Sequence, residues 1–81
     1  MNIYVGNVPF KMTESELHDL FANYGSVTSC KLIIDRETGR SKGFAFVEME
    51  DDNDGRTAIE ELNDREYHGR NLRVNEARPR R

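Results

Sequence analysis

An octapeptide at residues 42–49, Lys-Gly-Phe-Ala-Phe-Val-Glu-Met, carries the residue types that most constrain function. In a β-strand, successive side chains alternate between the two faces. The inward set would be Ala45, Val47 and Met49. The outward set would be Lys42, Phe44, Phe46 and Glu48. Two neighbouring phenylalanines are costly to leave in water unless a flat ligand covers them, and the lysine suits a ligand with negative charge. Nucleobases joined by phosphates meet both requirements.

Burial of this strand on both faces is the alternative interpretation. It would place Lys42 and Glu48 in an apolar layer, where charged groups are expensive to bury. It would also require a three-layer domain, and only two segments of this short chain have a helical pattern. The open face is therefore the favoured interpretation.

A second strand-like segment, Ile3-Tyr4-Val5-Gly6-Asn7-Val8, places Tyr4 alone on the face opposite Ile3 and Val5. The two segments together resemble the signature stretches of the RNA recognition motif, an octet [K/R]-G-[F/Y]-[G/A]-F-V-x-[F/Y] and an aliphatic-aromatic-aliphatic hexamer. Seven of the eight octet positions match. The exception, Met49, would face the core and leaves the proposed binding face unchanged.

The hydrophobic pattern predicts the element order strand, helix, strand, strand, helix, strand. The expected strands cover residues 2–6, 27–34, 42–49 and 72–76. Thr13 and Glu16 form a capping box that begins the first helix, and its apolar stripe is Leu17, Leu20, Phe21 and Tyr24. Gly25 is expected to end this helix in the left-handed conformation. Cys30, Leu32 and Ile34 are expected to face inward from the second strand.

The second helix is expected to begin at Asp51 or Asp52, with an inward stripe of Ala58, Ile59 and Leu62. Gly55 is costly inside a helix. Either the helix begins late or the backbone packs closely there. Residues 63–64 should end the helix, and residues 67–71 should form a small turn or hairpin around Gly69.

This order is that of the ferredoxin-like β-α-β-β-α-β fold, an α+β class. Right-handed crossovers place both helices on one face of a four-stranded antiparallel sheet. The resemblance implies the strand order 4-1-3-2, which makes the two signature strands central neighbours. We expect one domain over residues 1–77 and a basic tail over residues 78–81.

The resemblance also implies roles for individual residues. Tyr4 and Phe46 match the two aromatics that stack bases, Phe44 matches the aromatic between two sugars, and Lys42 matches the residue that pairs with a phosphate. Less strict positions edge the site and read bases. They are Asn7, Lys31, Ile33, Arg73, Asn75 and the backbone around Ala77 and Arg78.

The net charge of −3 is unusual for a protein that binds nucleic acid, but the charge is unevenly distributed. Residues 48–62 carry seven acids and one arginine, whereas residues 73–81 carry four arginines and one acid. Acidic residues therefore lie on the expected helices, and basic residues lie near the expected strands. We expect modest affinity, with two to four nucleotides of single-stranded RNA across the sheet, and single-stranded DNA as a ligand in vitro.

Other function classes have weaker support. A protein-interaction module on the same fold is the main alternative, although such domains usually lose a strand aromatic. An acyl phosphatase would need a glycine-rich loop with arginine, which residues 7–12 lack, so we expect no enzyme activity. One cysteine, Cys30, gives no disulfide and no metal cluster. We expect a protein without a cofactor or a membrane segment, present in the cytoplasm as a monomer. It is similar to short bacterial proteins with a single motif and to the glycine-rich group of RNA-binding proteins. We expect it to act in post-transcriptional regulation.

Overall fold

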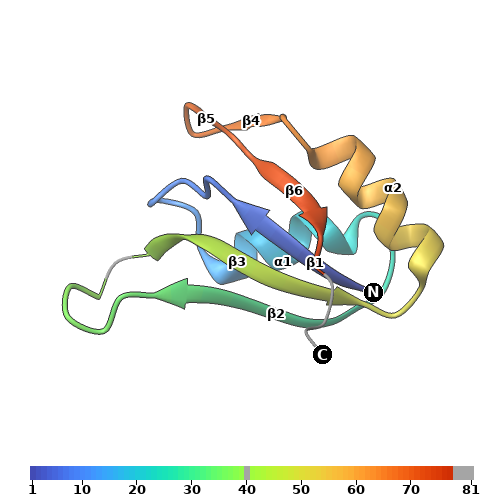
Figure 1. The fold of residues 1–81 in the computed structure, drawn as a ribbon, viewed down its shortest axis with the longest axis horizontal. Helices are drawn as coiled ribbons and strands as arrows, with labels where there is room; N and C mark the ends of the chain where they lie inside the picture. The colour runs from blue at the N-terminus through green and yellow to red at the C-terminus, as the bar shows by residue number, and fades with distance from the viewer. Residues whose placement is uncertain (40, 78–81) are drawn as a thin grey trace.

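Four strands form one antiparallel sheet in a computed structural model that describes residues 1–39 and 41–77. They are β1 (Asn2–Gly6), β2 (Val27–Ile34), β3 (Ser41–Met49) and β6 (Arg73–Glu76). Their order is β2-β3-β1-β6, so the strands with the two signature segments are central neighbours (Figure 1). The predicted fold class and strand order are therefore confirmed, while the predicted basic tail lies outside the described residues.

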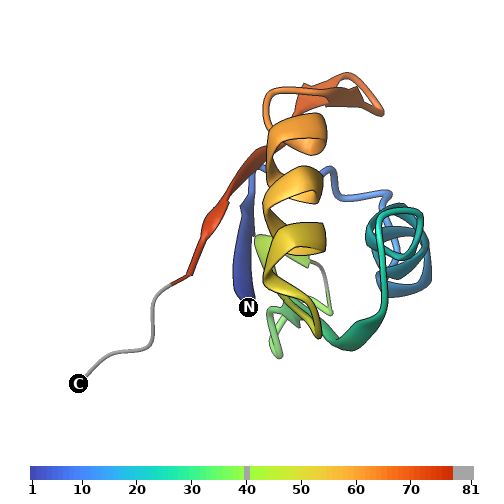
Figure 2. The same ribbon diagram turned by 90° about the vertical axis from the view of Figure 1, so that its right-hand side faces the viewer.

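Two helices, α1 (Glu14–Ala22) and α2 (Asp52–Leu62), lie on the same side of this sheet (Figure 2). Within residues 1–39 and 41–77 the opposite side of the sheet carries no helix, and this open face is the one toward the reader in Figure 1. In the described ranges, no helix combines the length and the apolar character that crossing a bilayer requires.

Helix α1 begins as the sequence predicts and ends differently. The Thr13 hydroxyl accepts a hydrogen bond from the Glu16 amide at 3.1 Å, which caps the first turn. The helix ends at Asn23 in a right-handed conformation, and Gly25 is not in the left-handed region. The predicted role of Gly25 is wrong. A β-carbon at this position would overlap the side chain of Asp54, so glycine allows the close approach of α2.

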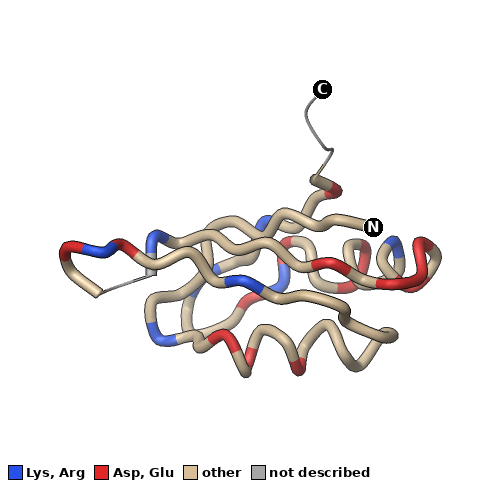
Figure 3. The backbone as a smooth tube through the Cα atoms, turned by 90° about the horizontal axis from the view of Figure 1, so that it is seen from below, with Lys and Arg blue, Asp and Glu red and all other residues tan. Residues whose placement is uncertain are grey.

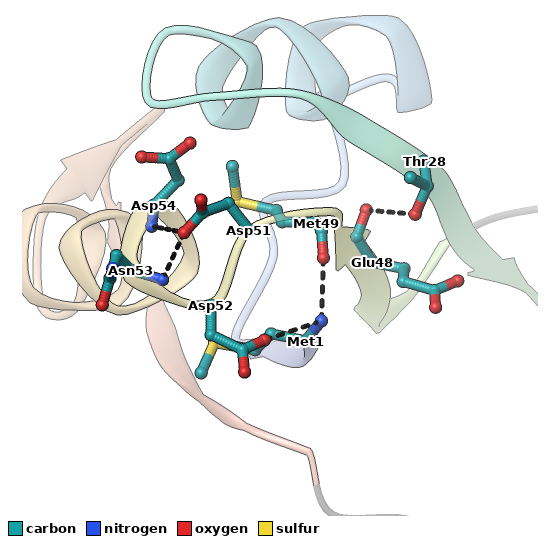
Figure 4. A network of polar contacts seen from close by, with 8 residues as sticks. All are labelled: Met1, Thr28, Glu48, Met49, Asp51, Asp52, Asn53 and Asp54. Carbon is teal, nitrogen blue, oxygen red and sulfur yellow. Dashed lines mark hydrogen bonds and ion pairs between the residues drawn. The ribbon is translucent and has the colours of Figure 1, made fainter.

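Helix α2 is capped by Asp51, whose carboxylate accepts hydrogen bonds from the amides of Asn53 and Asp54. Gly55 lies inside the helix, where an added β-carbon would come within 2.5 Å of the Met1 sulfur. Of the two explanations for this glycine, close packing is therefore the one that applies. The amino group of Met1 donates to the Met49 carbonyl at 2.8 Å and joins this end of the helix to β3 (Figure 4).

The predicted hairpin follows α2 and comprises β4 (Glu66–Tyr67) and β5 (Arg70–Asn71). Its turn residues His68 and Gly69 have positive φ angles of 50° and 83°, which match the left-handed conformation of tight hairpin turns. The hairpin projects from the same end of the molecule as the β1–α1 connection (Figure 1).

The core fills the space between the sheet and the two helices. Its buried apolar residues come from β1, β3, β6, the two helices and the connecting loops, and they are Ile3, Val5, Val8, Met12, Leu17, Phe21, Ala45, Val47, Met49, Ala58, Leu62, Leu72 and Val74, while Val27, Cys30 and Leu32 of β2 are partly buried against them. Of the residues predicted inward on β2, Ile34 is an exception with 52% exposure. The β2–β3 register shifts between Leu32 and Ile34, so the regular alternation does not extend to the end of the strand.

Candidate nucleic-acid interface

Three aromatic rings meet on the open face of the sheet. Tyr4 and Phe46 are register partners on β1 and β3, with ring centroids 5.7 Å apart. Phe44 lies 6.2 Å from Tyr4 and 6.1 Å from Phe46. Phe46 is 42% exposed, and the other two rings are half-buried because the three pack against one another. Both helices of the described residues lie on the other side of the sheet from this cluster (Figure 2).

Gly6 determines how close the Tyr4 ring lies to the sheet. A β-carbon at Gly6 would come within 2.9 Å of the ring carbon Cε2 of Tyr4. The Tyr4 ring therefore lies across Gly6. The register partner of Gly6 on β3 is Phe44. The absence of a side chain at Gly6 lets the rings of two strands converge on one surface.

The strand registers arrange the open face in rows across the sheet. The middle row contains Asn75, Tyr4, Phe46 and Lys31 on β6, β1, β3 and β2. The row toward the β4–β5 hairpin contains Arg73, Gly6 and Phe44. Six predicted site residues therefore have side chains in these two rows, five of them in the aromatic cluster or in the row of Tyr4 and Phe46. They are Tyr4, Phe44, Phe46, Lys31 and Asn75, and Arg73 extends the group on the edge strand.

Lys42 and Arg73 provide cations at the same end of the sheet. Lys42 is exposed near the beginning of β3. Arg73 is also exposed, and its guanidinium lies 3.8 Å from the Asp64 carboxylate, an ion pair that water screens strongly. Ile33 is half-buried on β2. Arg78, the remaining predicted side chain, lies outside the described residues.

Asn7 has a different setting from the other predicted site residues. Its side-chain amide donates to the Asn71 carbonyl at 2.8 Å and accepts from the Arg70 guanidinium at 3.1 Å. Arg70 in turn lies over the ring of Phe10, 5.1 Å from its centroid. Both polar groups of Asn7 therefore hold the β4–β5 hairpin against the end of β1.

A hollow of about 360 Å³ lies on the open face beside Phe46. Lys31 and Ala77, both predicted at the edge of the site, line it. Its other polar lining residues, Asn2, Ser29 and Glu48, were not among the predicted site residues. Glu48 shares a face with Phe46 by the alternation of β3, whereas the places of Asn2 and Ser29 follow from the register with β1 and β2, so the signal that could have identified these two is strand pairing.

Acidic residues are more concentrated on the helical side of the molecule than on the open face (Figure 3). Acidic residues gather along α1 and around the beginning of α2, whereas most of the basic residues lie on strands and connecting loops (Figure 3). Since like charges repel, a polyanion is disfavoured on the helical side. The electrostatic pattern agrees with the uneven charge found in the sequence.

Cys30 and His68 have side chains of the kind found in catalytic and metal sites. Burial, together with the charge of Glu14, raises the pKa of the Cys30 thiol to about 11, so the thiol is protonated and weakly nucleophilic at neutral pH. His68 is paired with Glu16, with Nε2 and Oε2 3.0 Å apart. Over residues 1–39 and 41–77, no group of three or more His, Cys, Asp or Glu side chains is placed to hold a metal ion.

Comparison with known proteins agrees with this geometry. The family model of the RNA recognition motif matches residues 3–73. RbpD of Nostoc sp. is 54% identical over 80 residues, which cover 99% of this chain and 85% of RbpD. The crystal structure of RNA binding protein PG1 has a TM-score of 0.93 and 59% sequence identity, and the match covers 100% of this chain and 98% of PG1.

A third match is the Rna15 RRM, solved with bound RNA (GU). Its TM-score is 0.86 at 36% sequence identity, and the match covers 94% of this chain and 81% of that chain. The signature segments, the strand order and the range matched by the family model all indicate the same family. The chain belongs to the RNA recognition motif family.

Proposed function

We propose that this domain binds single-stranded RNA on the open face of its sheet. Tyr4 and Phe46 each stack a base, Phe44 contacts the sugars between them, and Lys42 pairs with a phosphate. The observation that carries the proposal is the convergence of the three rings, 5.7–6.2 Å apart, on a surface without a helix. Aromatic side chains on such a sheet stack unpaired bases.

The surroundings of the rings support the same ligand. Lys31 lies beside Phe46 in the register, and Arg73 lies beside Gly6, so cations are available on both sides of the aromatic cluster. RNA is also the ligand in the solved complex of the similar Rna15 domain. Two stacking residues and a small number of phosphate contacts suit a site of two to four nucleotides.

The edge of the site supplies the remaining contacts. Asn75, Arg73, Lys31 and Ile33 lie along it, with the backbone around Ala77 and Arg78, while Asn7 contributes by holding the hairpin. The domain acts without enzyme activity, as a monomer in the cytoplasm, and controls transcripts after their synthesis. Single-stranded DNA binds to the same surface in vitro.

Phe46→Ala is expected to weaken binding of a short single-stranded RNA by about 1–3 kcal/mol, because that is the usual value of one base–aromatic stack. The fold should be unaffected, since the ring is 42% exposed and is not part of the core. Fluorescence anisotropy with a labelled hexanucleotide measures the loss, and thermal unfolding verifies the fold.

Glu60→Ala is the control, because Glu60 is exposed on α2, on the other side of the domain. An equal loss of affinity in both variants would remove the assignment of the site. The salt dependence separates RNA from a protein partner. Each phosphate contact should add about 0.7 to the slope of log affinity against log salt, and a slope near zero would favour a protein.

A further inference from the structure

The row of the sheet next to Tyr4 and Phe46 is polar. Asn2 on β1 is the register partner of Glu48 on β3, and Glu48 is also the partner of Ser29 on β2. Residues two apart on a strand share a face and lie about 6–7 Å apart. The edge of a base stacked on Phe46 therefore reaches the Asn2–Glu48–Ser29 row.

A ligand in the hollow beside Phe46 would contact the polar side chains of this row. Asn2, Ser29, Lys31 and Glu48 all line it. The Glu48 backbone carbonyl accepts a hydrogen bond from the Thr28 hydroxyl, whereas its carboxylate extends away from that contact (Figure 4). In the described part of the chain, no hydrogen bond or ion pair engages this carboxylate. It is therefore available to a bound base.

An ionised carboxylate only accepts hydrogen bonds, and its two oxygens can accept two parallel ones. Among the four RNA bases, guanine alone offers two adjacent donors on its Watson–Crick edge, N1–H and the 2-amino group. Uracil has one donor between two acceptors, and those acceptors would face the carboxylate oxygens. The guanine O6 next to N1–H is an acceptor, which suits the Lys31 ammonium on the neighbouring strand.

We infer that Glu48 makes this site selective for guanine at the base stacked on Phe46, with Lys31 as the donor to O6. The inference rests on the proposed function, because it concerns an edge of the same RNA site. Stacking tolerates every base, so selectivity has to come from such hydrogen bonds. A good bidentate contact discriminates about ten- to a hundredfold against the wrong base.

The test compares hexauridylate with a set of RNAs that carry a single guanosine at each successive position. At one position, guanosine should tighten binding by about tenfold or more, measured by fluorescence anisotropy at constant ionic strength. Inosine at that position should lose most of the gain, because it lacks the 2-amino group. Glu48→Gln should bind the guanosine and uridine RNAs with nearly equal affinity.

Glu50→Gln is the matched control, because it removes the same charge from an exposed residue just after β3 that does not line the hollow. It should keep the guanosine preference. The inference is overturned if Glu48→Gln keeps that preference, if it strengthens binding to every RNA equally, or if the wild type does not distinguish the RNAs. In these outcomes the proposed function stands. Failure of every RNA to bind would overturn both.

Discussion

Replacing Tyr4 and Phe46 together with alanine is expected to weaken RNA binding by about 2–5 kcal/mol, because each base–aromatic stack is worth about 1–3 kcal/mol and the losses at two touching rings are not fully additive. The two residues are register partners on the central strands, and they supply the two stacking surfaces of the proposed site. Their removal leaves cations and backbone groups but no platform for a base. Titration of a labelled hexanucleotide with the double variant measures the loss.

The single variants complete a double-mutant cycle. Because the two rings are in contact, at 5.7 Å between centroids, loss of one ring is expected to disturb the other. The two single losses should therefore exceed the double loss when added, by about 0.5 kcal/mol or more. A double variant with wild-type affinity would exclude this face as the RNA site, provided that its thermal unfolding matches the wild type.

Phe21→Ala is expected to lower the free energy of unfolding by about 3–5 kcal/mol. Phe21 lies on α1 with 0% exposure and is the largest of the fully buried side chains. Its removal leaves a cavity between the helix and the sheet. Small domains have total stabilities of about 5–15 kcal/mol, so the variant should unfold at a much lower urea concentration.

Phe10→Ala provides the control for this loss, because it removes an identical side chain from the surface. Phe10 is 62% exposed, and the Arg70 guanidinium lies over its ring, 5.1 Å from the centroid. The expected loss is at most about 1 kcal/mol, the value of an exposed cation–π contact. Comparable destabilisation by the two variants would show that the core does not depend on Phe21 as described.

Local signals were sufficient to predict most of the fold. Thr13 caps α1 because its hydroxyl bonds an amide only three residues away. The alternation of Ile3, Tyr4 and Val5 depends only on the pleat of one strand, and the structure places these residues as predicted. The aromatic rings could be assigned to one face for the same reason, since each strand's pattern is complete in itself.

Features that depend on residues far apart in the sequence could not be predicted in this way. The need for glycine at Gly25, in the loop after α1, comes from the side chain of Asp54 on α2. The side-chain amide of Asn7 is engaged by the β4–β5 hairpin, more than 60 residues away. The polar row beside Phe46 requires the register of three strands, including the shift between Val27 and Ser29. Such pairings become visible only when the elements are assembled.

The outer edge of β2 affects the tendency of the protein to aggregate. An unpaired edge strand offers its amides to a strand of another molecule, which is a common route to aggregation. Here the Glu14 carboxylate accepts a hydrogen bond from the Leu32 amide at 3.0 Å. Irregular pairing with β3 on both sides of this point further interrupts a flat template. The first turn of α1 therefore occupies an amide on the β2 edge and hinders pairing with a strand of another molecule there, while the open face of the sheet stays accessible to a ligand.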